Sequence, residues 1–177
     1  MKKLEIHRRA ENHRRKRIVP LSRMQTPDVV QTLLKYPRRL EELLDMLGDN
    51  DLSIRGRAAA TLARLSESRP ERLLYEMPRL REHINDDSDY VRWHLVYAFG
   101  EIGVRVLSAP TREYWADVFA RMGDNNRIVR VVAVKVAVRL AAKHPDAVAA
   151  FFHDLQRPVP SELAKFLPEG SAEQVIN

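Results

Sequence analysis

The sequence predicts an all-α protein whose paired helices stack into an α-α superhelix. Three observations predict this class. An Asp in a short polar turn, followed six residues later by an Arg that stands behind an aliphatic residue, recurs in three segments. Apolar residues on both sides of each turn follow the i, i+3, i+4, i+7 spacing of one helix face. No segment shows the sustained polar/apolar alternation that is typical of a strand with hairpin turns.

The repeat is defined by its charged pairs. Its Asp and Arg positions are Asp49 and Arg55, Asp86 and Arg92, and Asp124 and Arg130. The step from one Arg to the next is 37 and then 38 residues. A constant offset within a near-constant period indicates a repeat architecture, in which each unit is a helical hairpin that must stack on its neighbours to bury its apolar side.

The elements follow from this frame. Thr26 before Pro27 is a helix cap, so a helix over 28–36 is expected as half of an incomplete leading unit. About three full hairpins follow, and prolines mark the entries to the leading helices at positions 37, 70, 78 and 145. Segments 144–155 and 161–167 form a closing partial unit. These boundaries give a solenoid domain over 20–167 and a loose tail over 168–177.

Two features of the third hairpin stand out. Its second helix carries five Val residues beside the core positions, between 131 and 138, so we expect it to be covered on more than one side. Trp115 and Phe119 lie on its first helix and are predicted to be core residues.

The net charge of +6 is confined to the beginning of the chain. Residues 1–19 form a basic arm in which eight cations face Glu5 and Glu11, while acidic and basic residues balance in the remainder. The cations are Lys2, Lys3, Arg8, Arg9, Arg14, Arg15, Lys16 and Arg17. Two interpretations stay open: a handle for phosphate backbones or an acidic protein, and a solvated tail or end cover.

The turns resemble those of the HEAT-repeat family, whose unit has an Asp in the turn and a Val-Arg pair opening the second helix. The pairs that match are Ile54-Arg55, Val91-Arg92 and Val129-Arg130, and the matching turn residues are Asp49, Asp86 and Asp124. The resemblance covers about residues 37–155. It implies a ladder of hydrogen-bonded charge pairs between neighbouring turns, and bidentate bonding explains why Arg recurs there instead of Lys.

In such a solenoid the second helices line the inner curve. Counting from each Arg, the positions that face away from the core combine aromatic and cationic side chains. The predicted partner-binding residues are Arg57, Arg64, Trp93, His94, Tyr97, Lys135 and Arg139. Such a mixture suits an acidic peptide or a nucleic acid, although Trp93 and Tyr97 could equally pack against neighbouring helices.

Nothing in the sequence defines a reaction centre. The chain has no cysteine, no His-Glu pair like those of the iron-binding HEAT enzymes, no G-x-x-x-x-G-K loop and no G-x-S-x-G elbow. Its acidic turns lack the glycine and final Glu of a calcium loop. We therefore predict no catalytic, metal or cofactor site and no membrane partner, and we expect a soluble, cytoplasmic protein.

Two functions remain at this point. The first is a non-catalytic scaffold that binds a protein partner through its inner surface. The second is a nucleic-acid-binding protein that uses the arm and the inner Arg and Lys residues, comparable in architecture to HEAT-like DNA-repair glycosylases but without an identifiable catalytic Asp. Neither the partner nor the oligomeric state follows from the residues.

Overall fold

The computed structural model describes residues 19–108 and 110–169. The basic arm, except Val19, and residues 170–177 of the tail lie outside this part of the chain. Every regular element in the described residues is helical, and no strand occurs among them. The α-helices are α2 Thr26–Lys35, α3 Leu40–Asp45, α4 Leu52–Ser68, α5 Met77–Glu82, α6 Asp89–Arg105, α7 Arg112–Ala120, α8 Arg127–Lys143, α9 Pro145–Asp154 and α10 Ser161–Ala164.

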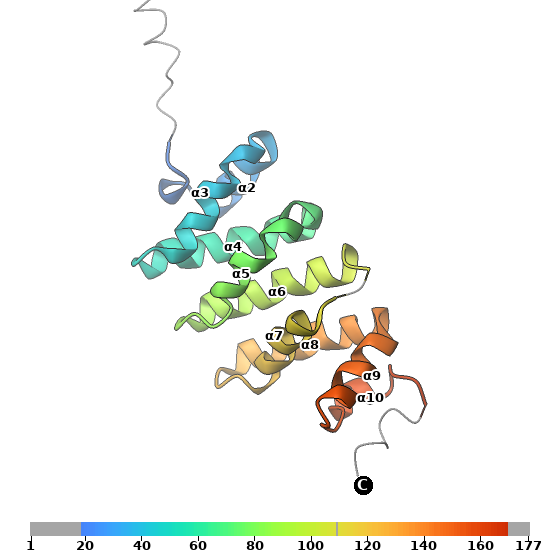
Figure 1. Cartoon of the computed structure of the whole chain (residues 1–177). Helices are drawn as coiled ribbons and strands as arrows, with labels where there is room; N and C mark the ends of the chain where they lie inside the picture. The colour runs from blue at the N-terminus through green and yellow to red at the C-terminus, as the bar shows by residue number, and fades with distance from the viewer. Residues whose placement is uncertain (1–18, 109, 170–177) are drawn as a thin grey trace, which may run out of the picture.

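The helices form hairpins that stack in chain order from one end of the molecule to the other (Figure 1). The pairs are α3 with α4, α5 with α6, and α7 with α8, preceded by α2 and closed by α9 and α10. The α-α superhelix predicted from the sequence is therefore confirmed. Short 3-10 segments extend the leading helices, at Pro37–Arg39, Met46–Gly48, Pro70–Glu76 and Arg121–Gly123.

The second helices α4, α6 and α8 pack directly on one another along the stack. We call them the inner layer, and the leading helices α3, α5, α7 and α9 the outer layer. Side-chain ion pairs bridge the outer layer from unit to unit: Arg79 on α5 reaches Glu41 and Asp45 of α3, and Arg81 on α5 reaches Asp117 of α7.

The core is made by the inward stripes that the repeat spacing predicts. Leu62, Phe99 and Ala137 occupy equivalent positions of α4, α6 and α8, and each is at most 1% exposed. Trp115 is buried and stacks on the half-buried Phe119, as expected for core residues. The layers approach closely at α6, where a Cβ on Gly103 would lie 1.9 Å from the Tyr114 hydroxyl. Glycine is therefore needed there for packing.

The ends of the stack differ in detail from the sequence-based expectation. Helix α2 begins at Thr26, after Gln25, and no side chain caps it, so the predicted Thr26 cap is wrong. Helix α9 starts at Pro145 as expected, but α10 is a single turn whose Leu163 is fully buried near α8.

Helix α8 is contacted by α6, α7, α9 and α10, in keeping with its apolar sequence. One side of it is nevertheless open, since Ile128 is 60% and Val131 is 44% exposed.

Candidate functional site

The turns carry a continuous hydrogen-bonded ladder. Arg92 donates from Nε and Nη2 to the two carboxylate oxygens of Asp124, both at 2.9 Å, and from Nη1 to the Asp86 and Asp87 carbonyls at 2.9 and 3.0 Å. Arg55 repeats this arrangement one unit earlier, with Asp86 at 3.0 Å and the Asp49 carbonyl at 3.0 Å. Each of these arginines thus joins its own turn to the next turn.

Each repeat Asp has a second task in its own turn. The side chains of Asp49, Asp86 and Asp124 accept a hydrogen bond from the backbone N–H two residues further on, at 2.8, 2.8 and 2.9 Å. Such a turn requires a short side chain with a carbonyl-like oxygen, and a carboxylate is needed to receive the arginine as well. The hydrogen bonds from Arg92 hold the pKa of Asp124 below its ordinary value.

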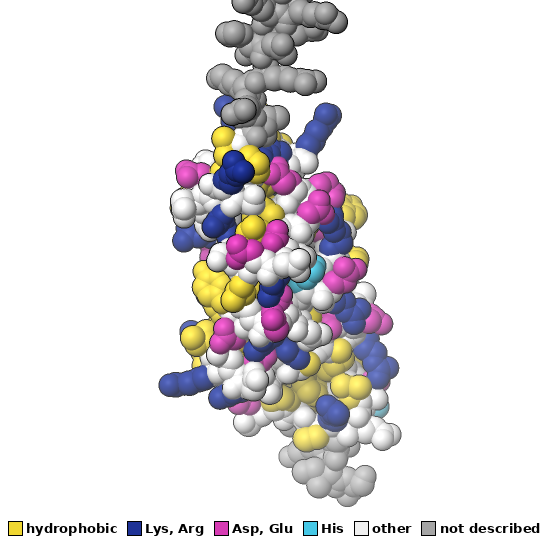
Figure 2. Space-filling view, turned by 90° about the vertical axis from the view of Figure 1, so that its left-hand side faces the viewer, with side chains coloured by type: hydrophobic (Ala, Val, Ile, Leu, Met, Phe, Trp, Pro, Cys, Tyr) yellow, Lys and Arg dark blue, Asp and Glu magenta, His cyan; other side chains and the backbone are white. Residues whose placement is uncertain are grey.

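At the trailing end the ladder changes. Arg130 donates to the Asp124 and Asn125 carbonyls of its own turn, at 2.6 and 3.0 Å. No carboxylate bonds Arg130 among the residues that the structure describes, because the closing unit has no repeat Asp. Figure 2 looks onto the turn edge, where side chains of both charges alternate along the stack. These arginines and aspartates are engaged with one another, so the turn edge is a structural element.

Three rows of equivalent positions on α4, α6 and α8 make up what we call the inner face, although Gly56, Ala60 and Glu101 among them are buried. A row contains equivalent positions of the three helices, and successive rows are four residues apart on each helix. The first row is Gly56, Trp93 and Val131, the second is Ala60, Tyr97 and Lys135, and the third is Arg64, Glu101 and Arg139.

The first row is apolar and partly uncovered. Tyr90 and Ile128 flank it one turn earlier and are 49% and 60% exposed. The Tyr90 ring lies over Gly56, where a Cβ would approach it to 3.2 Å, and meets Trp93 edge-on at a centroid distance of 5.8 Å. Gly56 therefore leaves room for an aromatic shelf on the inner face.

His94 is not an accessible partner-binding residue, contrary to the prediction. It is 7% exposed, stacks against Trp93, and its Nδ1 lies 2.8 Å from the Tyr90 carbonyl oxygen. Burial lowers the pKa of its imidazole. The helix phase counted from Arg92 turns this position toward α4, so His94 supports Trp93 from beneath.

The second row consists of a buried alanine, a half-buried tyrosine and an exposed lysine. Tyr97 is half-buried and its hydroxyl donates to Glu67 at 3.0 Å, which ties α6 to α4. Burial, and then this hydrogen bond, raises the pKa of Tyr97 to about 12, so the side chain is a neutral phenol at physiological pH. Lys135 is exposed, and no ion pair involves it among the described residues.

The third row is cationic at its surface. Arg139 pairs with the buried Glu101 carboxylate at 2.5 Å, and Arg105 approaches the same carboxylate at 3.7 Å. Arg64 is exposed. Arg57 was predicted to face a partner, but it is half-buried and donates to the Ser22 carbonyl, so it anchors the leading segment instead.

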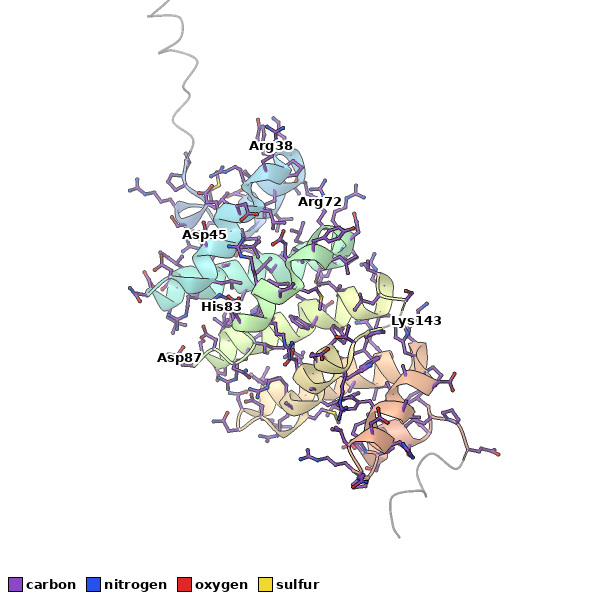
Figure 3. All side chains as sticks on the ribbon, in the orientation of Figure 1. Arg38, Asp45, Arg72, His83, Asp87 and Lys143 are labelled. Carbon is purple, nitrogen blue, oxygen red and sulfur yellow. The ribbon has the colours of Figure 1, made fainter. Side chains whose placement is uncertain are left out.

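The edge opposite the turns is also basic. Figure 3 shows Arg72 and Lys143 there, while Asp45 and Asp87 lie on the turn side. Asp87 precedes the start of α6 and Lys143 ends α8, and both placements agree with the helix dipole, because anions stabilise helix starts and cations helix ends. Across the inner face, a ligand therefore meets apolar side chains on one flank and cations on the other.

No arrangement of catalytic groups accompanies these rows. No group of three or more potential metal ligands exists in the described ranges. On the outer layer, a hollow of about 340 Å³ between α5 and α7 contains Asp117, whose pKa is raised by burial and which pairs with Arg81 at 2.5 Å. This pair bridges two units and fills a structural role. None of the described helices has the length and apolarity needed to cross a membrane.

The chain is similar to known proteins in its fold and not in its sequence. No family model matches the chain. No curated protein sequence matches it either. Among solved structures, it is similar to a computationally designed armadillo repeat protein for modular peptide recognition, with a TM-score of 0.52 and 19% identity over 85% of this chain and 69% of that one. The chain is thus a helical repeat solenoid.

Proposed function

We propose that this protein is a non-catalytic scaffold that binds a segment of a protein partner across its inner face. The observation that carries the proposal is the apolar surface at the first row and its flank, where Tyr90, Ile128 and Val131 are each more than 40% exposed although they belong to the most closely packed layer of the fold. Exposed apolar patches rimmed by polar side chains are typical of interaction sites.

The composition of this surface supports a protein ligand. Aromatic side chains and arginines contribute most of the binding energy in protein interfaces, and the inner face combines Tyr90 and Trp93 with Arg64 and Arg139. The similar designed armadillo protein is described as made for peptide recognition. That likeness shows the fold, and the same use of the inner layer is part of our proposal.

A display selection tests the proposal. Peptides are selected on the full chain, and their affinity is then measured for the variant Ile128→Asp/Val131→Asp. We expect a loss of about tenfold or more, the effect of removing an interface hot spot. Both positions lie in the first turns of α8, where a carboxylate suits the helix dipole, so the fold is expected to persist.

The matched control is Tyr75→Asp, because Tyr75 is 86% exposed on the outer layer. Selected peptides should bind this control as tightly as the unmodified chain, and circular dichroism should show equal helical content in all three proteins. The proposal fails if no peptide is enriched, or if enriched peptides bind the inner-face variant undiminished.

The nucleic-acid alternative depends on the arm over 1–19, which lies outside the described residues apart from Val19. On the inner face, the exposed Glu67 interrupts a cationic path, and the apolar first row offers no phosphate contact. A salt titration separates the two functions. Phosphate neutralisation by the arm makes affinity for duplex DNA or RNA fall by roughly 10³-fold between 50 and 200 mM salt, whereas peptide affinity should change far less.

A further inference from the structure

The ladder of the turn edge stops at Arg130, yet this arginine is held in the same way as its predecessors. Nη1 of Arg130 donates to two backbone carbonyls of its own turn, as Nη1 of Arg92 does. The remaining edge of Arg92, Nε and Nη2, donates to both carboxylate oxygens of Asp124. Among the residues that the structure describes, no group accepts a hydrogen bond from that edge of Arg130. Arg130 is thus oriented for a carboxylate that lies beyond the third hairpin.

The side of α8 next to this arginine is incompletely covered. The equivalent positions on α4 and α6 are Ala59 and Val96, and both are 0% exposed. They are covered because the next second helix packs on this side, as Gly100 shows by its close approach to Val136 of α8. The equivalent residue on α8 is Val134, which is half-buried. The third hairpin therefore lacks the neighbour that the first two have.

The neighbour is missing because the closing unit is short. Helices α4, α6 and α8 have 17 residues each, whereas α10 has four. Cover on α8 decreases toward the turn edge, since Ala141 is fully buried, Val138 is half-buried, and Val131, which borders the inner face, is 44% exposed. We call the following residues the trailing side of α8: Arg127, Arg130, Val134 and Val138.

The established contacts between hairpins indicate what fits this side. On α4 and on α6 the trailing side receives a helix, and the turn before that helix supplies the carboxylate for the arginine. Arg127 and Val138 are eleven residues apart on α8, which is about 16 Å at 1.5 Å per residue. A helix of about three turns, preceded by a turn with a carboxylate, therefore continues the same packing.

The charge of α8 requires an acidic occupant. This helix carries five cations and no acidic residue. Its Arg127 stands at the position of Asp89 on α6, and Asp89 accepts a hydrogen bond from Asn126 of the following turn. Because the charge at this position is reversed, the occupant needs a carboxylate where Asn126 stands, two residues after the equivalent of Asp124. Such a residue also suits the start of a helix.

A second copy of the chain does not supply this helix. Its first turn has the right spacing of carboxylates, Asp49 and Asp51, before α4. The side of α4 that would have to pack on α8 is already occupied, because α2 lies on α4, Arg57 donates to Ser22, and Leu65 is 1% exposed. Two copies of α8 packed on each other would place cations against cations, which is unfavourable. The occupant is therefore another protein.

We propose that the trailing side of α8 binds a short acidic helix of a partner protein, of about three turns and preceded by an Asp-x-Asp turn. The first Asp accepts hydrogen bonds from Nε and Nη2 of Arg130, and the second meets Arg127 and caps the helix. Apolar residues of the partner helix cover Val134 and Val138. The inference goes beyond the inner-face function, because Arg130 and Val134 belong to none of the three rows.

The test uses a synthetic peptide as a probe. It has the turn sequence of residues 48–51, Gly-Asp-Asn-Asp, followed by three helical turns held by a side-chain staple, with one apolar stripe and Glu at the other positions. A counterpart peptide has the first Asp replaced by Asn. Fluorescence anisotropy with the full chain gives both dissociation constants. We expect the counterpart to bind about tenfold or more weakly, because it cannot form the charged bidentate pair.

Arg130→Gln completes a double-mutant cycle with the two peptides. It should weaken the probe by about tenfold or more and remove the difference between the probe and its counterpart. Arg112→Gln, which removes an exposed cation of α7, is the matched control and should retain that difference. Val134→Gln should weaken both peptides. Circular dichroism should show equal helical content in all variants, and the Asp-to-Asn change in the peptide tests the pair without altering the protein.

Three results would overturn the inference: equal binding of the probe and its counterpart, a difference that survives Arg130→Gln, or no binding of either peptide. It is also overturned if analytical ultracentrifugation shows a dimer of the full chain that Arg130→Gln dissociates, because a second copy then occupies the trailing side. These outcomes leave the inner-face function standing, since its own test is the response of selected peptides to Ile128→Asp/Val131→Asp.

Discussion

Arg92 and Asp124 form a bidentate pair between two turns, with both nitrogen–oxygen distances at 2.9 Å and side-chain exposures of 10% and 2%. The same arginine is hydrogen-bonded to the carbonyls of its own turn. The pair therefore connects the second hairpin to the third through groups that are almost fully removed from water.

Removing the carboxylate should destabilise the protein strongly. Asp124→Ala leaves the buried Arg92 guanidinium without its partner and opens the turn at Asn126, so the free energy of unfolding should fall by about 3 kcal/mol. Urea denaturation followed by circular dichroism measures this. The control is Asp87→Ala, whose carboxylate bonds Arg55 but is 86% exposed; it should cost less than about 1 kcal/mol. Equal losses would contradict a buried ladder.

The same pair predicts a pH dependence. The pKa of Asp124 is lowered in the folded protein, chiefly by its hydrogen bonds from Arg92, from an ordinary value of 3.8. Its stabilisation is therefore complete above that value and is lost as the pH falls through the lower, folded-state pKa. The stability difference between the unmodified chain and Asp124→Asn should be constant from pH 7 to 5 and shrink below pH 4. A difference that widens in acid would refute this assignment.

Close packing at α6 gives a steric prediction. Gly103→Ala places a methyl group 1.9 Å from the Tyr114 hydroxyl and 2.7 Å from Leu140, so it should lower stability by about 1–3 kcal/mol or more. Gly123→Ala is the control, because nothing lies within 4 Å of its new methyl group, and it should be neutral or slightly stabilising. Thermal unfolding of both variants measures this difference in stability. Equal stabilities would show that α6 and α7 move apart easily.

The ion pairs of the outer layer should matter less. Arg79→Ala removes contacts to Glu41 and Asp45, but the three side chains are 37%, 69% and 74% exposed. We expect a loss below about 1 kcal/mol, reduced further by 1 M salt because exposed charges are screened. A larger loss, measured in the same denaturation experiment, would show that these contacts position the units more firmly than their exposure implies.

Much of the fold could be predicted because the repeat is defined by residues that are close together in the sequence. Asp86, Arg92 and the leucines around them combine turn geometry, helix phase and hydrophobic periodicity, and all three agree with the stacked hairpins. The start of α2 was misjudged because a good capping residue, Thr26, stands inside the helix, where Gln25 instead adopts the extended backbone that precedes it.

The candidate surface could be predicted less well. The helix phase predicts which row each side chain belongs to, as it does for Trp93, Tyr97, Lys135 and Arg139. It does not predict how exposed each side chain is, because exposure depends on the residues of adjacent helices. His94 is covered by Tyr90 and Trp93, and the Tyr90 ring can pack against α4 because position 56 is a glycine. Arg57 is engaged by Ser22, a contact between segments 35 residues apart, which no local pattern reports.

Tyr90, Ile128 and Val131 are surface residues that were not among the predicted partner-binding positions. Their signal was present, since they are large apolar residues outside the buried stripe of their helices. For Val131 the signal predicts extra burial of the third hairpin, and the structure differs because the position of the missing cover over α8 depends on where the closing unit packs.

The ladder has a consequence for molecular recognition. Because each of Arg55 and Arg92 is bonded to two successive turns at once, neighbouring hairpins have little freedom to tilt apart. The spacing of the ligand-binding side chains on the inner layer is consequently set before a ligand binds. Binding then costs less conformational entropy than it would in a solenoid whose hairpins move freely. The charged pairs along the turn edge therefore fix the spacing of successive hairpins.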